Sequence, residues 1–420
     1  MPEVSVGRMP FNEAIDYFQK KLLIPSRQWT DMVGPIHAKG FTVAGATSLS
    51  LLQDLYSTVQ DSILDGTTLT EFRKRFDDIV SRHGWSYKGK RGWRTRVIFQ
   101  VNKRSAYMAG RWEQIWRLKD IRPFLQYLTV GDERVRQSHR PWHGIILPVD
   151  HPFWRTHYPP NDWLCRCNAR SRSKDDIEEE GLKVSNMAEP TPTSYADPDT
   201  GEVVKKYKGV GIGWDYNVGQ AWLAPEAIFG QQLMEIPADL RKEALKWMDT
   251  DVYDRPFKRL VNKVGTQVAK GQRPAAGHAQ TAGYLASEVI EFLQSKGKGP
   301  ASTVIVAKDS DIAHWLRDTK AARNQMVPIS VASSLPGIVR TPDAVLYEKA
   351  NGRLLFVRRL SDGRYAKFVV AIGLKGKIQH NKSRFNETLN LVKTAGIVAA
   401  YNLLQKEYEL IFGEIVREAR

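Results

Sequence analysis

The chain has 420 residues, of which 42% are hydrophobic, and its formal net charge is +16. Because one hydrophobic core rarely serves a chain of this length, two or three domains are expected. The sequence contains no apolar run of the length that a membrane helix needs, and the N-terminus lacks the charged-then-apolar layout of a signal peptide. A membrane-spanning or secreted protein is therefore not expected.

The positive charge is concentrated in parts of the chain. Residues 81–140 contain 15 Lys and Arg against 4 Asp and Glu, whereas residues 171–200 contain 3 against 8. A basic surface attracts polyanions at long range. DNA, RNA and an acidic protein surface all remain open as partners of the basic segments.

The N-terminal region predicts helices over residues 12–23, 49–64 and 68–84, because apolar residues recur three or four apart. The third has Thr68 or Thr70 as a cap and Gly84 after its end. A longer helix is expected over residues 95–118, with Lys and Arg on one face. The basic face is either a solvated surface or a contact with a polyanion. Nearby aromatic residues either stack on exposed bases or belong to the core. These aromatics are Trp85, Tyr87, Trp93 and Phe99.

Residues 129–171 hold four histidines and both cysteines of the chain, and little of this segment predicts a regular helix. In order come Asp132 and Arg134, His139 and His143, Pro159–Pro160, and the run Cys165-Arg166-Cys167. The segment resembles the head-morphogenesis signature of the Mu F-like minor head proteins of tailed phages. The resemblance extends upstream of this segment and so covers about the first 170 residues. It continues more weakly to residue 220, and residues after about 250 are expected to lie outside it.

This resemblance implies a minor capsid protein of a Mu-like phage or prophage that acts in procapsid assembly near the portal. The implied partners are the portal and other phage head proteins, without a membrane. The implied locations are the virion and the host cytoplasm.

The same segment offers a possible metal site. His139, His143, Cys165 and Cys167 supply two imidazoles and two thiolates, a donor set that suits zinc, with His151 and His157 as spare ligands. The cysteine spacing is unusual, and Pro141 prevents the first two histidines from sharing a helical face. The alternative is a Trp-rich loop region with ordinary histidines and buried apolar cysteines. A disulfide between Cys165 and Cys167, which have one residue between them, would close almost no loop. A catalytic Cys–His pair is not favoured either, because the sequence shows no oxyanion-hole motif.

The remainder predicts a multidomain α+β protein: a head-morphogenesis domain over residues 1–170, an acidic Pro/Gly-rich linker over 171–224, a helical connector over 225–299 and an α+β domain over 300–420. A small hairpin is expected around residues 199–201. The last domain predicts a strand, a helix and a hairpin around residues 361–363, hence an antiparallel sheet. Its layout resembles phage-borne nuclease domains of the barnase, EndoU, colicin and RelE-like group.

That second resemblance implies metal-independent RNA cleavage, which needs an acid, a base and cations on the phosphate. His314 and His380 are the candidate acid–base groups, although His314 could be an ordinary helix-surface histidine. The candidate cations and polar groups on the phosphate are Arg340, Arg358, Arg359, Lys367, Lys382, Arg384 and Thr394. A toxin-like nuclease would imply an immunity protein. The alternative is a purely structural head protein whose last domain binds nucleic acid or protein without catalysis.

Overall fold

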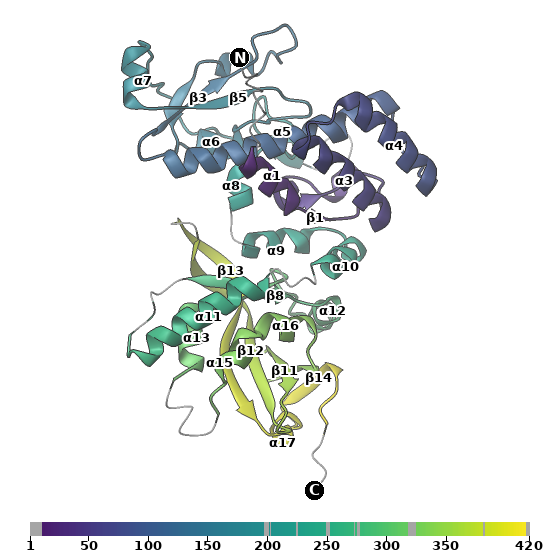
Figure 1. Ribbon diagram of the computed structural model, residues 1–420, viewed down its shortest axis with the longest axis vertical. Coiled ribbons are helices and arrows are strands. Elements are labelled where there is room, and N and C mark those ends of the chain that lie inside the picture. Colours follow the sequence, from purple (N-terminus) through teal and green to yellow (C-terminus); the bar gives the residue numbers. More distant parts are fainter. Residues whose placement is uncertain are drawn as a thin grey trace, which may run out of the picture. The chain divides into compact units, whose positions relative to one another are not determined.

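The computed structural model describes residues 11–196, 201, 203–223, 226–248, 253–272, 274, 278–317, 325–380 and 383–416. The chain forms two compact units, residues 1–223 and 224–420 (Figure 1). Both mix helices and strands, so the predicted α+β class is confirmed. Within the described ranges, every helix is too short or too polar to cross a membrane.

The first unit begins with helices α1 (Asn12–Gln19), α3 (Leu49–Leu64), α4 (Leu69–His83) and α5 (Arg91–Leu118). Between α1 and α3 lie the parallel pair β1 (Leu22–Leu23) and β2 (Gly40–Phe41), a 3-10 turn (Trp29–Asp31) and α2 (Ile36–Lys39). Thr68 and Glu71 form a capping box at the start of α4, and Gly84 ends that helix in the left-handed conformation, as its sequence predicts. α5 packs against α1 and α3 (Figure 1).

The aromatic residues around α5 belong to the core of this unit. Phe99 is buried, and Trp85 and Tyr87 pack against the same hydrophobic cluster. The guanidinium of Arg94 lies 5.1 Å from the centre of the Trp85 ring and donates to the carbonyl of Ala44. The structure therefore favours the core interpretation of these aromatics over base stacking, whereas Trp93 is exposed.

A three-stranded antiparallel sheet follows, in the order β4-β3-β5, with β3 at Phe124–Leu128, β4 at Ile146–Pro148 and β5 at Asn168–Arg172. The β3–β4 connection contains a 3-10 turn (Arg140–Trp142), and the β4–β5 connection contains α6 (Phe153–Thr156). The histidines and cysteines of the signature segment lie in these two connections. Because β4 and β5 both pair with β3, the two connections that carry these residues lie beside the same small sheet.

Residues 171–223 are not a free linker, in contrast to the expectation from their composition. β5 is followed by α7 (Lys174–Glu179), by the antiparallel pair β6 (Thr193–Ala196) and β7 (Val203–Lys206), and by α8 (Val218–Leu223). The β6–β7 pair confirms the predicted strands, and residues 197–200 of the predicted turn lie outside the described residues. Val210, Trp214 and Val218 are buried in the core of the first unit, which gives this segment the apolar area it needs to order.

The second unit contains helices α9 (Glu226–Glu235), α10 (Ala238–Trp247) and α11 (Asp254–Ala269), followed by a seven-stranded sheet. The sheet order is β14-β10-β11-β12-β13-β9-β8, and the strand bounds are β8 Ala279–Tyr284, β9 Val304–Lys308, β10 Ala344–Glu348, β11 Arg353–Arg359, β12 Tyr365–His380, β13 Ser383–Val398 and β14 Tyr408–Gly413. The helices between strands are α12 Ser287–Ser295, α13 Asp309–Trp315, α15 Ile329–Ser333, α16 Leu335–Arg340 and α17 Ala400–Leu403.

Two features of this sheet differ from the expectation. Within the expected helical connector, a helix is predicted over residues 281–297, but residues 281–284 belong to the edge strand β8 and the helix α12 spans Ser287–Ser295. β13 pairs with β9 in parallel, so the sheet is mixed rather than antiparallel. The predicted β11–β12 hairpin is present. α13 packs on one face through Trp315 and Phe368, whose ring centres are 5.8 Å apart, and α17 contributes Ala400 and Leu403 to a cluster that contains Val369.

Candidate metal centre

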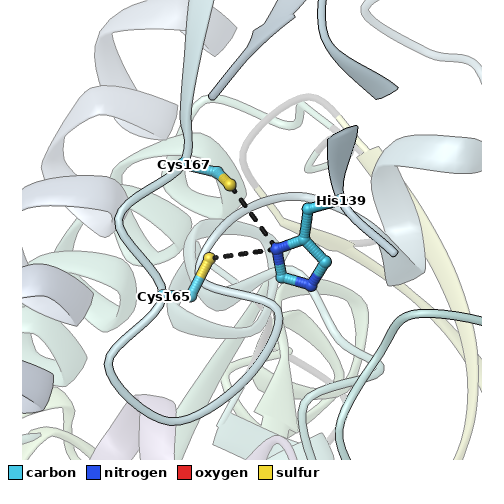
Figure 2. Close-up of side chains that lie close together, drawn as sticks. All are labelled: His139, Cys165 and Cys167. Carbon is cyan, nitrogen blue, oxygen red and sulfur yellow. Dashed lines mark hydrogen bonds between the residues drawn. The ribbon is translucent and has the colours of Figure 1, made fainter. Parts of the chain in front are cut away.

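One imidazole and two thiols meet in the first unit. Nδ1 of His139 lies 3.5 Å from Sγ of Cys167 and 3.8 Å from Sγ of Cys165 (Figure 2). All three residues are buried, and their possible ligand atoms lie within 4.8 Å of one another. His139 comes from the β3–β4 connection and both cysteines from the end of the β4–β5 connection. This group can hold a metal ion.

A backbone carbonyl fixes the orientation of the histidine. Nε2 of His139 lies 2.8 Å from the carbonyl oxygen of Gly209, which can only accept a hydrogen bond. The proton of the neutral ring is therefore on Nε2, and the lone pair of Nδ1 points at the two sulfurs. The ring also stacks on Trp142, at 4.9 Å between ring centres. This tautomer is the one in which Nδ1 can bind a metal.

The two thiols share a hydrogen bond that makes them unequal. The bond from Cys167 holds the pKa of Cys165 well below that of an ordinary thiol, and backbone N–H groups of Asn161 and Cys167 lower it further. The same bond, together with burial, raises the pKa of Cys167. The buried guanidinium of Arg104 donates to the carbonyl of Cys167. A cation bound between the two sulfurs would displace the protons that they carry.

An ion pair explains why an arginine stands between the cysteines. Nη1 and Nη2 of Arg166 lie 2.7 and 2.6 Å from the two carboxylate oxygens of Asp132. Arg166 therefore points to the surface of the β3–β4 connection while Cys165 and Cys167 point inward. Asp132 also accepts a bond from the backbone N–H of Arg134 at 3.1 Å. The ion pair therefore joins Asp132, at the start of the signature, to the Cys165-Arg166-Cys167 run at its end.

The remaining histidines of the segment are not part of this group. His143, a predicted ligand, is exposed, and its Nδ1 accepts from the backbone N–H of Thr129 at 3.1 Å. The 3-10 turn that contains Pro141 separates it from His139, so the structure does not bring His143 to the two cysteines. His151 bonds the carbonyl of Met187 at 3.0 Å, and burial lowers the pKa of His157 to about 4.

The predicted catalytic residues of the second unit lie on several elements. His314 is exposed on α13, whose residues Asp311 and Trp315 face the sheet. Thr394 on β13 pairs with Val369, which lies on the opposite face from Phe368, the partner of Trp315. Strand alternation thus places His314 and Thr394 on different sides of the sheet.

The predicted phosphate-binding residues have other neighbours. Arg340 on α16 forms a bidentate pair with Asp254 at 2.5 and 2.9 Å. Arg358 donates to the carbonyl of Thr341, and Arg359 is exposed. Burial lowers the pKa of Lys367 on β12. Lys382 and the side chains of His380 and Arg384 lie outside the described residues.

Sequence reasoning missed two members of the metal centre, Gly209 and Arg104. Gly209 is 70 positions from His139, with nothing in the spacing to connect them. Arg104 belongs to the basic face of α5, where its charge suggests a surface role, yet its guanidinium is buried against the cysteine loop. The glycines around Gly209 indicate a turn that packs against the preceding module, but they do not identify His139 as its contact.

Comparisons with known proteins agree with the signature. Residues 53–170 match the family described as Phage Mu protein F like protein. The chain is 28% identical over 425 residues to the putative capsid assembly protein F of Escherichia phage Mu, covering 94% of each chain. It is 29% identical over 351 residues to the Mu-like prophage FluMu F protein of Haemophilus influenzae, covering 77% of this chain and 84% of that protein. No solved structure matches.

The extent of this similarity corrects one expectation. The resemblance was expected to end before about residue 250, but an alignment that covers 94% of the chain includes most of the second unit as well.

Proposed function

We propose, from the match of residues 53–170 to the family described as Phage Mu protein F like protein, that this chain takes part in assembling the head of a Mu-like phage or prophage. The observation that carries the proposal is the alignment with the putative capsid assembly protein F of phage Mu, which covers 94% of both chains. Both units are therefore shared with a protein of that name.

The finer role that we propose is that of a minor head protein that acts near the portal during procapsid assembly and stays in the virion. Its partners would be the portal and other head proteins. Two features of the first unit favour a rigid protein-binding module over a flexible tether. One is its large buried core, and the other is the Asp132–Arg166 ion pair between the two signature loops.

Gene deletion tests this proposal. In a lysogen that carries the prophage, removal of the gene should abolish DNA-filled heads, and expression of the chain from a plasmid should restore them, as counted by electron microscopy of the lysate. Mass spectrometry of purified particles should detect the chain. An unchanged yield of DNA-filled heads after deletion would overturn the proposal.

For the second unit we propose a role in the same assembly, because the phage Mu relative contains this part too and the unit is not an addition to one member of the family. RNA cleavage is a second candidate. Its candidate residue His314 lies three positions after Asp311 on α13, whose buried carboxylate lies 2.6 Å from Nζ of Lys393 on β13.

The purified chain should degrade RNA without added metal if this second candidate is correct, and His314→Ala should lower the rate by about a hundredfold or more. His278→Ala, which removes another exposed histidine of the same unit, is the matched control. Absence of cleavage by the wild-type chain, or normal heads with His314→Ala, would leave assembly as the role of this unit.

A further inference from the structure

The distances between His139, Cys165 and Cys167 fit a bound zinc ion. Zinc sits about 2.3 Å from sulfur and about 2.0 Å from nitrogen in tetrahedral sites, so a nitrogen and a sulfur on the same ion lie about 3.5 Å apart. The two observed nitrogen–sulfur distances are 3.5 and 3.8 Å. The three donor atoms therefore already surround a space of the right size, and a small shift of each side chain completes the contacts.

The electrostatic surroundings also suit a cation with two thiolates. Two thiolates neutralise the charge of Zn²⁺, so the site places no net charge among the surrounding aromatic rings. Among the described residues the group has three members, which leaves the fourth tetrahedral position to a water molecule.

The ring of His139 connects this site to a distant part of the chain. With Nδ1 bound to the ion, the only remaining proton of the ring is on Nε2, 2.8 Å from the carbonyl of Gly209. A bond of this kind, from a ligating histidine to a backbone carbonyl, is typical of metal sites and holds the ring in place. The backbone N–H of Gly211 donates to the carbonyl of Asn161 at 2.9 Å, beside the cysteines.

We infer that His139, Cys165 and Cys167 bind one zinc ion, and that the bound ion fastens residues 207–214 onto the first unit. The ion selects the ring tautomer that donates to Gly209 and holds the cysteine loop that receives Gly211. Without the ion, the bond to Gly209 is left to hold the ring in this tautomer by itself, and the pair of thiols can rearrange. The attachment of this segment then depends on metal loading, whatever contacts the protein makes in a phage head.

Metal analysis of the purified full-length chain tests the site. One equivalent of zinc is expected in the wild type, and less than about a tenth of an equivalent in Cys165→Ser, Cys167→Ser and His139→Ala. His143→Ala is the matched control, because His143 lies in the same connection and is exposed, and it should retain one equivalent. Wild-type chain without zinc, or equal zinc in the ligand variants, would overturn the site.

Cobalt gives a readout that does not depend on whether the variants fold. The wild-type chain, stripped with a chelator and loaded with Co²⁺, should show the intense absorption of a tetrahedral thiolate site. An octahedral cobalt spectrum would refute the proposed ligand set.

Hydrogen exchange tests the link to Gly209 separately. Removal of zinc from the wild-type chain should speed amide exchange in residues 207–214 by about tenfold or more, while exchange in α3 and α4 stays within about twofold. Zinc binding with unchanged exchange in this segment would preserve the site and refute the fastening.

Discussion

Replacing Gly209 with alanine would perturb the segment that closes over the metal centre. Gly209 has a φ of +82°, and a Cβ added there would lie 2.7 Å from the ring of Trp142 and 3.3 Å from Cβ of Ser138. The left-handed conformation costs about 1–2 kcal/mol for a residue with a side chain. The contact with a buried tryptophan adds about 1–3 kcal/mol of overpacking. We therefore expect the free energy of unfolding of the first unit to fall by about 2–5 kcal/mol.

Denaturant unfolding of the zinc-loaded full-length chain, followed by tryptophan fluorescence, measures this change. Gly144→Ala is the matched control: its φ is +84°, but nothing lies within 4 Å of its added Cβ. The control should lose only the conformational cost of about 1–2 kcal/mol. Equal losses for the two variants would refute the reasoning, because the contact with Trp142 would then cost nothing.

Three further substitutions test other parts of the first unit. Burial lowers the pKa of Lys21 to about 7, so between pH 7 and 10 the unfolded chain binds more protons than the folded chain. The free energy of unfolding of the wild type should therefore rise with pH in this range, relative to Lys21→Met, by about 1.4 kcal/mol per pH unit. Below pH 7 the difference between the two should not change with pH. Arg94→Lys should cost about 1–3 kcal/mol in denaturant unfolding, because one ammonium cannot both donate to the Ala44 carbonyl and cover the Trp85 ring. Asp132→Asn should cost only about 0.2–1 kcal/mol and leave the zinc content unchanged, since the pair with Arg166 is solvent-accessible; loss of zinc in this variant would show that the pair positions the cysteines.

The sequence predicts an element well where its ends are marked locally. α4 is the clearest case, because Thr68, Glu71 and Gly84 define both ends by hydrogen bonds and backbone conformation within one turn of the chain. β8 shows the opposite case. Its six residues, AQTAGY, carry no marked ends or clear periodicity, and pairing with β9 makes them a strand.

The sequence predicted which types of residue form the candidate metal site, but not which individual residues do so. Two cysteines and a histidine-rich segment suggest a metal, yet the choice between His139 and His143 depends on how the turn at Pro141 directs the chain. The carbonyl of Gly209 could not be found from spacing, because the contact forms only when a segment 70 residues away packs on Trp142. In the second unit, the sequence names His314 and Thr394 as candidates but gives no sign that the sheet separates them.

The return of the chain to His139 at Gly209 means that residues 168–208 form an excursion with both ends held at the same place. It includes the exposed β6–β7 pair, whose strands end at Ala196 and begin again at Val203. A length change there alters neither anchor, and doubling such a loop costs only about 0.6 kcal/mol of closure entropy. This position is therefore suited to an epitope or fluorescent tag, with which the location of the chain within an assembling particle could be followed by microscopy while the signature loops stay intact.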